Sequence, residues 1–253
     1  MNVINAYVFF IGLCIGSFLN VCISRTIKDE SVVWPASYCD KCGNRLKAID
    51  LVPVVSYIIL RGRCRGCHEK ISKEYPLVEL LNAFLYLCIY EKYGLSFYFI
   101  KYCIIASIVI VTAIIDIKTY NVYTKISIFA LVSGILFNII GFLFFNIEIN
   151  TYIVGAIISY LALLFIAKVT RAMGKGDVDI ASVCGLFLGS KFIILTMFIA
   201  IILGGIAGVF LIFFKGKDRK DKLPFVPFIA IGTVLSIFVG DYLINWYLNF
   251  YLL

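Results

Sequence analysis

The sequence predicts an all-α polytopic membrane protein with about eight transmembrane helices and a small cytoplasmic module between the first two. Three observations predict this class. Of the 253 residues, 62% are hydrophobic and only 15% are charged, against about 45–50% and about 25% in soluble domains. Apolar runs of roughly 20 residues, long enough to cross a bilayer as helices, recur along the chain. The one long polar stretch, residues 25–75, interrupts them early. A soluble globular enzyme is therefore excluded.

Eight apolar segments are expected to cross the membrane. The stretch 178–214 is almost twice as long as one span needs, so Gly189-Ser190-Lys191 is expected to turn between two helices. We accordingly predict a first helix (1–24), a cytoplasmic module (25–75) and a seven-helix domain (76–253). The eight segments cover residues 3–24, 76–93, 97–115, 125–146, 151–168, 178–189, 191–214 and 224–250.

The distribution of Lys and Arg sets the expected orientation. With residues 25–75 in the cytoplasm, all of the 23 basic residues except Lys92, Lys101 and Lys191 fall on that side, including Arg171 and the run 215–222. Cytoplasmic loops of membrane proteins carry this excess, so both termini are expected outside. The net charge of +8 then faces anionic lipid headgroups. Membrane lipid is thus an expected partner, and no nucleic acid is expected.

Four of the nine cysteines form two Cys-x-x-Cys pairs in the polar stretch, Cys39/Cys42 and Cys64/Cys67. Their separation is close to the spacing of a four-thiolate zinc site, which leaves no position for water and is structural. A module of this size with few apolar residues cannot fold on its own core, and a metal supplies the missing stability. Two disulfides or idle thiols are the alternatives. His68, the single histidine, is expected to be a solvated neighbour.

The backbone of each cysteine pair is expected to turn at a glycine. Gly43 and Gly66 supply the permissive conformation that such knuckles favour.

Two aspartates lie at the predicted cytoplasmic boundary of the membrane. Asp116 ends one apolar run, and Asp177 follows Gly174 and Gly176 at the start of another. Ionisable residues at such places are functional candidates by default. Two adjacent carboxyls can share one proton, so that one activates water while the other protonates a peptide carbonyl. The two glycines would let an extended substrate backbone come close.

Structural explanations stay open for these acids. Asp177 can cap a helix, and Asp116 can pair with Lys118 or Lys125. Glu79, one turn into the second predicted span, is a further candidate for the same reason as the aspartates.

The ordered motifs of the chain resemble those of the bacterial type IV prepilin peptidases, membrane aspartyl proteases with a G-x-G-D motif. The resemblance covers nearly the whole chain. The motifs are Gly16-Ser17-Phe18-Leu19-Asn20-Val21 with Arg25, the paired cysteines, Asp50-Leu51-Val52-Pro53, Leu60-Arg61-Gly62, Tyr75-Pro76-Leu77-Val78-Glu79-Leu80, Ile115-Asp116, Gly174-x-Gly176-Asp177-Val178 with Gly185 and Gly189, and Pro224-Phe225-x-Pro227-Phe228.

The resemblance implies a function. Asp116 and Asp177 match the catalytic pair, which cleaves the short basic leader of pilin-like precursors at the cytoplasmic face of the bacterial inner or plasma membrane. Many members then methylate the new N-terminus with S-adenosylmethionine, and Glu79 is a candidate for that activity. The cysteine module is typical of the bacterial members. Two alternatives remain: a methyltransferase alone, or a transporter with Asp116 and Asp177 as ion sites and a regulatory zinc module.

Three positions depart from the family pattern. Tyr123-Thr124 replaces a Pro-Asp or Pro-Asn pair, and Thr124 is expected to cap the following helix instead. Asp179 stands where the family usually has lysine, which puts an anion near the second aspartate. Val226 replaces the glycine of a Pro-Phe-Gly-Pro turn.

Overall fold

The structure, a computed structural model, describes residues 3–170, 173–215 and 223–251. Its described part is helical and contains no strand, which confirms the all-α class. Five basic residues of the predicted loops lie outside the described part: Arg171, Lys217, Arg219, Lys220 and Lys222. The helices are α1 (Val3–Ile27), η1 (Ala48–Leu51), α2 (Val55–Ile59), α3 (Glu74–Tyr93), α4 (Phe97–Thr119), α5 (Thr124–Phe145), α6 (Ile149–Thr170), α7 (Lys175–Lys215) and α8 (Val226–Tyr251).

Among the described residues, six helices are long and apolar enough to cross a membrane: α1, α4, α5, α6, α7 and α8. The predicted number of eight is therefore corrected. One difference arises because α7 contains two of the predicted spans. The other is α3, which carries Glu74, Glu79, Glu91 and Lys92. This charge content separates α3 from the six helices, although it follows α1 closely.

The predicted turn in α7 is present at Gly189, whose φ of 79° and ψ of 172° break the helical path. Contacts at the far ends indicate that the chain reverses there. In one straight helix, Asp177 and Gly204 would lie about 40 Å apart. Instead, both residues lie near the start of α8. Asp177 interacts electrostatically with Asp116, and Asp116 accepts a hydrogen bond from the Val226 amide. A Cβ on Gly204 would lie 2.8 Å from the ring of Phe225, the residue before Val226.

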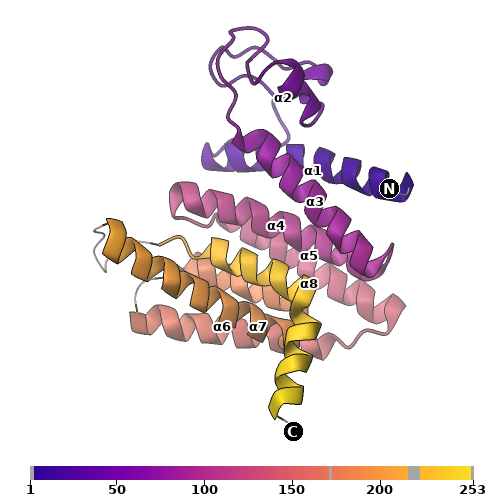
Figure 1. Cartoon of the computed structure of the whole chain (residues 1–253), viewed down its shortest axis with the longest axis vertical. Helices are drawn as coiled ribbons and strands as arrows, with labels where there is room; N and C mark the ends of the chain where they lie inside the picture. The colour runs from indigo at the N-terminus through magenta and orange to yellow at the C-terminus, as the bar shows by residue number, and fades with distance from the viewer. Residues whose placement is uncertain (1–2, 171–172, 216–222, 252–253) are drawn as a thin grey trace. The chain divides into compact units, whose positions relative to one another are not determined.

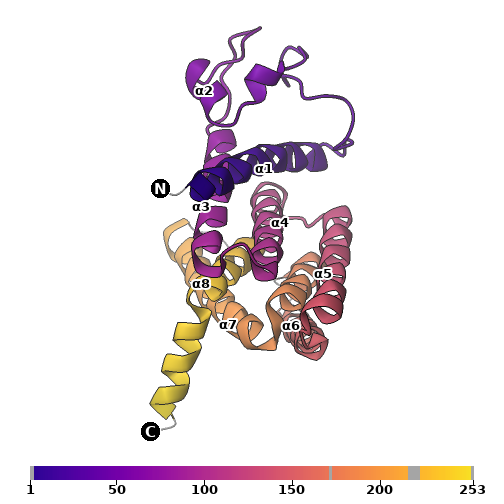
Figure 2. The ribbon, with the colours of Figure 1, turned by 90° about the vertical axis from the view of Figure 1, so that its right-hand side faces the viewer.

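The structure divides into two compact units after Phe99. In the first unit, α1 and α3 lie side by side (Figures 1 and 2) and run antiparallel. A Cβ on Gly12 would lie 2.6 Å from the Cα of Ala83, and one on Gly16 would lie 2.7 Å from the Cα of Glu79. These glycines let the two backbones approach closely, as small residues do between membrane helices.

Asparagine side chains add hydrogen bonds along the same seam. The Asn82 amide donates to the Gly12 carbonyl at 2.8 Å, and the Asn20 amide donates to the Tyr75 carbonyl at 2.9 Å. Polar groups that would be costly in lipid thus find partners in the neighbouring helix.

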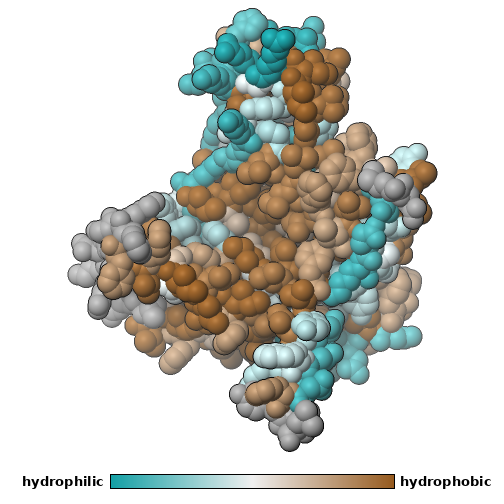
Figure 3. Space-filling view, viewed as in Figure 1, coloured by the Kyte–Doolittle hydropathy of each residue, from teal (hydrophilic) through white to brown (hydrophobic). Residues whose placement is uncertain are grey.

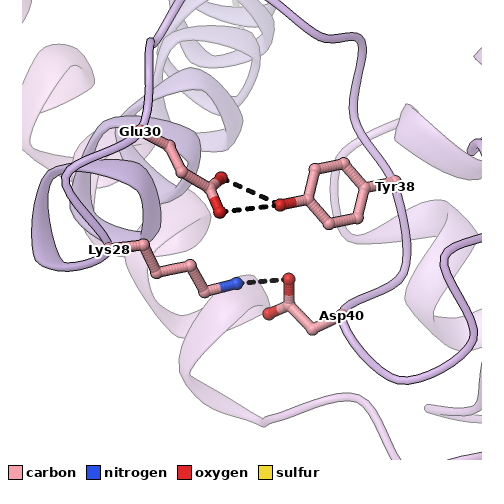
Figure 4. A network of polar contacts seen from close by, with 4 residues as sticks. All are labelled: Lys28, Glu30, Tyr38 and Asp40. Atoms are coloured by element: carbon pink, nitrogen blue, oxygen red, sulfur yellow. Dashed lines mark hydrogen bonds and ion pairs between the residues drawn. The ribbon is translucent and has the colours of Figure 1, made fainter.

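The segment between α1 and α3 is anchored to the end of α1. A polar network joins Lys28 to Asp40 and the Tyr38 hydroxyl to both carboxylate oxygens of Glu30, at 2.8 and 3.0 Å (Figure 4). Arg25, which is buried, donates to the carbonyls of residues 31, 32 and 35. These bonds tie residues 31–40, which lead into the first cysteine pair, to the end of α1.

In the second unit, the two halves of α7 pack against different helices. Before the Gly189 break, α7 packs on α6, where Cβ atoms on Gly155 and Gly185 would clash with the opposite backbone at 2.7 and 2.5 Å. After the break, α7 packs on α8: the Thr196 hydroxyl donates to the Ser236 oxygen at 2.9 Å. Close helix packing through small residues explains Gly155 and the motif glycine Gly185.

Lys101 lies in the predicted span 97–115, near the end that is expected outside. It is fully buried in α4. Its Nζ donates to Asn138 Oδ1 at 3.1 Å and lies 3.4 Å from the centroid of the Tyr152 ring. Asn138 in turn donates to the Leu186 carbonyl at 2.9 Å. The Lys101 amine therefore has an amide oxygen and an aromatic face as partners, which offset the cost of removing it from water.

Candidate active site and metal centre

Asp116 lies near the end of α4 and is only 3% exposed. Its Oδ2 accepts a hydrogen bond from the backbone amide of Val226 at 3.1 Å. Val226 is the first residue of α8, and the first amides of a helix have no partner within it. An acceptor from α4 therefore satisfies the start of α8, and it fixes the Asp116 carboxylate in return.

Asp177 lies in the first turn of α7 and is 7% exposed. Its Oδ2 accepts the Gly174 amide at 2.9 Å. This is half of a capping box, in which an acidic third residue bonds back to the cap amide. Asp177 is therefore not the N-cap residue anticipated from the sequence but the third residue of the helix. Its bond to the cap amide occupies one oxygen and does not explain why a second acid lies nearby.

The two carboxylates come from helices 61 positions apart in the sequence, yet their charges act on each other. Like charges that interact disfavour double ionisation, and a pair of this kind can share one proton. A pair of this kind combines a base and an acid in one place, which is the chemical requirement for hydrolysing an amide without a metal or a histidine.

The glycines before Asp177 differ from each other. A Cβ on Gly176 would lie 2.4 Å from Cβ of Val122, so packing accounts for that glycine. A Cβ on Gly174 would meet nothing closer than Asp177 Oδ2 at 3.8 Å. Approach of a substrate backbone remains a prediction for this pair, and Gly174 is the position with room for it.

Two departures from the family pattern look different in three dimensions. Each residue of a helix is turned by about 100° from the one before it, so Asp177 and Asp179 point to nearly opposite sides. Asp179 is exposed, whereas Asp177 is buried. Asp179 interacts with Lys175 across one turn. The expected cap at Thr124 is wrong: α5 begins there, its cap residue is Tyr123, and no side chain bonds the cap amides.

Sequence reasoning missed the contribution of Val226. Its amide positions Asp116, but backbone donors leave no mark on residue type. The signal was the start of a helix after Pro224, because helix starts offer free amides to acids.

The four predicted cysteines form one cluster. Their sulfur atoms all lie within 4.8 Å of one another, and the Sγ atoms of Cys39 and Cys67 are 3.9 Å apart. Tetrahedral zinc with Zn–S bonds of about 2.3 Å needs sulfurs about 3.8 Å apart. A disulfide needs about 2.05 Å, and all four thiols are free. The geometry therefore fits one zinc ion rather than two disulfides.

The two cysteine pairs have the same backbone fold. In the first, the Cys39 amide donates to the Asn44 carbonyl and the Gly43 amide donates back to the Cys39 carbonyl. In the second, the Cys64 amide donates to the Glu69 carbonyl and the His68 amide donates back to the Cys64 carbonyl. Each knuckle needs one left-handed residue four positions after its first cysteine.

Gly43 provides that residue in the first knuckle, with φ of 73°, as predicted. In the second knuckle the expectation for Gly66 is wrong, because His68 takes the left-handed position with φ of 57°. Gly66 has another reason: a Cβ there would lie 2.5 Å from Asn44 Nδ2 of the first knuckle. His68 is exposed and is not part of the sulfur cluster.

The local electrostatics favour a thiolate in the second knuckle. Hydrogen bonds from the backbone amides of Cys67 and Gly66 lower the pKa of the Cys64 thiol to about 7. Burial and hydrogen bonds to the neighbouring thiols raise the pKa of the Cys67 thiol to about 12. Cys64 is therefore the thiol of this knuckle that is favoured as a thiolate, the form that zinc binds.

Glu79 is buried in α3 but reaches the module. Its Oε2 accepts the Val54 amide at 2.7 Å, and the Ser17 hydroxyl of α1 bonds the same carboxylate. Val54 has φ of 59°, which is unusual for a β-branched residue. Glu79 thus joins two helices to the module and holds a strained turn.

These features define a class of multi-pass membrane protein. It has two buried aspartates, one near the end of α4 and one at the start of α7, and a module with four clustered thiols. The chain belongs to the type IV leader peptidase family. Residues 10–93 match the bacterial peptidase A24 N-terminal domain, and residues 103–209 match the type IV leader peptidase family. The two matches fall on either side of the division between the structural units.

Curated relatives agree with this assignment. The prepilin leader peptidase/N-methyltransferase of Pectobacterium carotovorum subsp. carotovorum is 30% identical over 92% of this chain and 92% of its own length. The protein of the same name from Bacillus subtilis is 29% identical over 95% and 96%, and that from Aeromonas hydrophila is 28% identical over 97% and 94%. No solved structure matches the chain.

Proposed function

We propose that this protein is a prepilin leader peptidase that uses Asp116 and Asp177 as its catalytic pair. The observation that carries the proposal is a pair of buried, interacting carboxylates from α4 and α7, each held by a backbone amide, in a chain of this family. The substrate is the precursor of a pilin-like protein, in which a short basic leader precedes an apolar helix.

In this mechanism the pair shares one proton. The ionised carboxylate takes a proton from water, which attacks the scissile carbonyl carbon, and the protonated carboxyl donates to the carbonyl oxygen. When the tetrahedral intermediate collapses, the C–N bond breaks and the amine leaves with a proton from the pair. Hydrogen bonds from Val226 and Gly174 hold the two carboxylates in place throughout.

The proposed orientation puts this site at the cytoplasmic boundary of the bacterial inner or plasma membrane, with both termini outside. The excess of Lys and Arg on that side supports it. A precursor anchored by its apolar helix presents its cleavage site at the same boundary.

Zinc is the proposed structural metal. Cys39, Cys42, Cys64 and Cys67 would hold it, and the spacing of their sulfurs supports this. Four thiolate bonds close the module and leave the metal no open position for catalysis.

Methylation of the new N-terminus, with S-adenosylmethionine as donor, is proposed from the names of the relatives. Glu79 was the candidate residue for it. Because its carboxylate accepts bonds from Val54 and Ser17, we assign Glu79 a positioning role and derive no transfer step through it.

Leader removal from a co-expressed precursor tests the peptidase assignment. Asp116→Asn and Asp177→Asn keep an oxygen to accept the Val226 and Gly174 amides but lose the charge and the shared proton. Each is expected to slow cleavage by at least about 10³-fold with unchanged protein level. Asp179→Asn, on the opposite face of the helix, is the matched control and should cleave normally. Normal cleavage by either of the first two variants would refute the pair.

A further inference from the structure

The module carries an apolar surface that the zinc site does not explain. We define it as the apolar loop face: Ile49, Leu51, Val52, Val55, Ile58 and Ile59. These side chains are 36–67% exposed. Figure 3 shows hydrophobic side chains gathered over the α2 end of an otherwise hydrophilic module. The expectation of a module with few apolar residues is therefore wrong for residues 48–60. Exposed patches of this kind mark a binding surface.

The depth of this face relative to α1 follows from one hydrogen bond. Val54, directly before α2, donates to Glu79 Oε2 at 2.7 Å, and Glu79 also bonds Ser17. Glu79 lies five residues inside α3, about 7 Å from its start, and Ser17 lies ten residues, or about 15 Å, from the end of α1. Because α1 is long and apolar enough to span a membrane, the start of α2 lies deeper than the membrane surface from which α1 emerges.

The charges beside the face match a lipid surface. From 41 to 68 the sequence has one acid, Asp50, and Arg65 pairs with it at 2.7 Å. Lys47 precedes the face and Arg61 and Arg63 follow it, and all three are exposed. Long basic side chains at the rim of an apolar surface extend to phosphate groups while their stems stay in the apolar layer.

We propose that the apolar loop face is inserted into the cytoplasmic leaflet of the membrane beside α1 and α3, with Lys47, Arg61 and Arg63 bound to anionic headgroups. The module is then a monotopic element tied to the bilayer through its own side chains as well as through α1. Its apolar residues lie at the boundary of headgroups and acyl chains, where amphipathic segments insert about 5–10 Å.

Depth-dependent fluorescence quenching in proteoliposomes tests this proposal. The two tryptophans of the chain are removed by Trp34→Phe and Trp246→Phe, and Ile58→Trp introduces one indole on the face. Lys70→Trp, at an exposed site in the second knuckle, is the matched control. Bilayers of phosphatidylcholine and phosphatidylglycerol carry bromine on their acyl chains. Bound zinc is measured in both variants to verify that the module is folded.

The indole of Ile58→Trp is expected to emit at shorter wavelength and to be quenched at least about twice as strongly as that of Lys70→Trp. Ile59→Trp, on the same face, repeats the measurement if Ile58→Trp loses zinc. Equal, weak quenching in folded face and control variants would overturn the proposal. So would an emission shift that requires a precursor peptide, because the face would then bind peptide. Unchanged quenching in pure phosphatidylcholine would refute the role of the basic rim.

Discussion

The cysteine module and the helical bundle of α4–α8 are stabilised in different ways. The bundle buries large apolar side chains such as Ile105, Phe187 and Ile229, and its polar groups are paired inside. In the described module between α1 and α3, Cys64 and Pro53 are the buried apolar residues. A bundle of this kind is stabilised by packing, whereas the module depends on bonds to a metal.

Both regions expose apolar side chains, and the comparison explains why. In the bundle, exposed residues such as Phe142, Leu161 and Phe198 belong to helices that can span a membrane, so lipid covers them. In the module, the apolar loop face has the same character without a long helix. Exposure of apolar surface therefore indicates contact with lipid in one region and supports the same contact in the other.

Loss of the metal should produce the largest difference in stability between the module and the bundle. Cys64→Ser is expected to abolish zinc binding and to open the module to proteases, since structural zinc supplies about 10–16 kcal/mol of folding free energy in isolated fingers. The bundle should stay intact. Metal content and limited proteolysis measure both effects. Cys88→Ser, which removes an exposed thiol of α3, is the control. A Cys64→Ser protein that keeps zinc and resists proteases would break the comparison.

The buried lysine tests the bundle. Lys101→Ala leaves Asn138 Oδ1 without its donor and the Tyr152 ring without its cation, and is expected to cost about 2 kcal/mol. Thermal unfolding in lipid nanodiscs measures the loss, with zinc content unchanged. Lys125→Ala, at an exposed position, serves as the control. If both variants melt together with the parent protein, the Lys101 contacts contribute nothing to stability.

Close helix packing should matter in α1 and not on an open helix face. Gly12→Val places a Cβ 2.6 Å from the Cα of Ala83, so the helices must separate at a cost of about 1–3 kcal/mol. Gly208→Ala, where a Cβ meets no protein atom within 4 Å, should be neutral or stabilising by up to about 1 kcal/mol. The same nanodisc melting experiment compares them. Equal effects would contradict the tight α1–α3 contact.

The smallest effect is expected from the ion pair of the module. Arg65 lowers the pKa of the Asp50 carboxyl by hydrogen bonding to it. The pair thus stabilises the module above the ordinary pKa of aspartate, and this contribution is lost as pH falls through the lowered value. Because Arg65 is half exposed, Arg65→Met should cost at most about 1 kcal/mol. Protease resistance at neutral pH should change little, and a collapse would show that charge rather than zinc holds the module.

Some of the site could be predicted from residue types alone. Two Cys-x-x-Cys pairs can bring four thiols to one ion through local turns, so their cluster followed from spacing. Asp116 and Asp177 were identified because ionisable residues are rare at the ends of apolar runs. The burial of Lys101 could not be predicted, because a basic residue near the end of a span is usually at the surface, and only the neighbouring Asn138 and Tyr152 make its burial possible.

The sequence by itself determined the all-α class and the thiol cluster and drew attention to the two aspartates, because each depends on local composition or short spacing. Tertiary structure alone decided that Asp116 accepts the Val226 amide, that His68 rather than Gly66 turns the second knuckle, and that Glu79 holds the Val54 turn. These contacts join residues that are distant in the chain or depend on backbone groups, which every residue carries and no sequence pattern can distinguish.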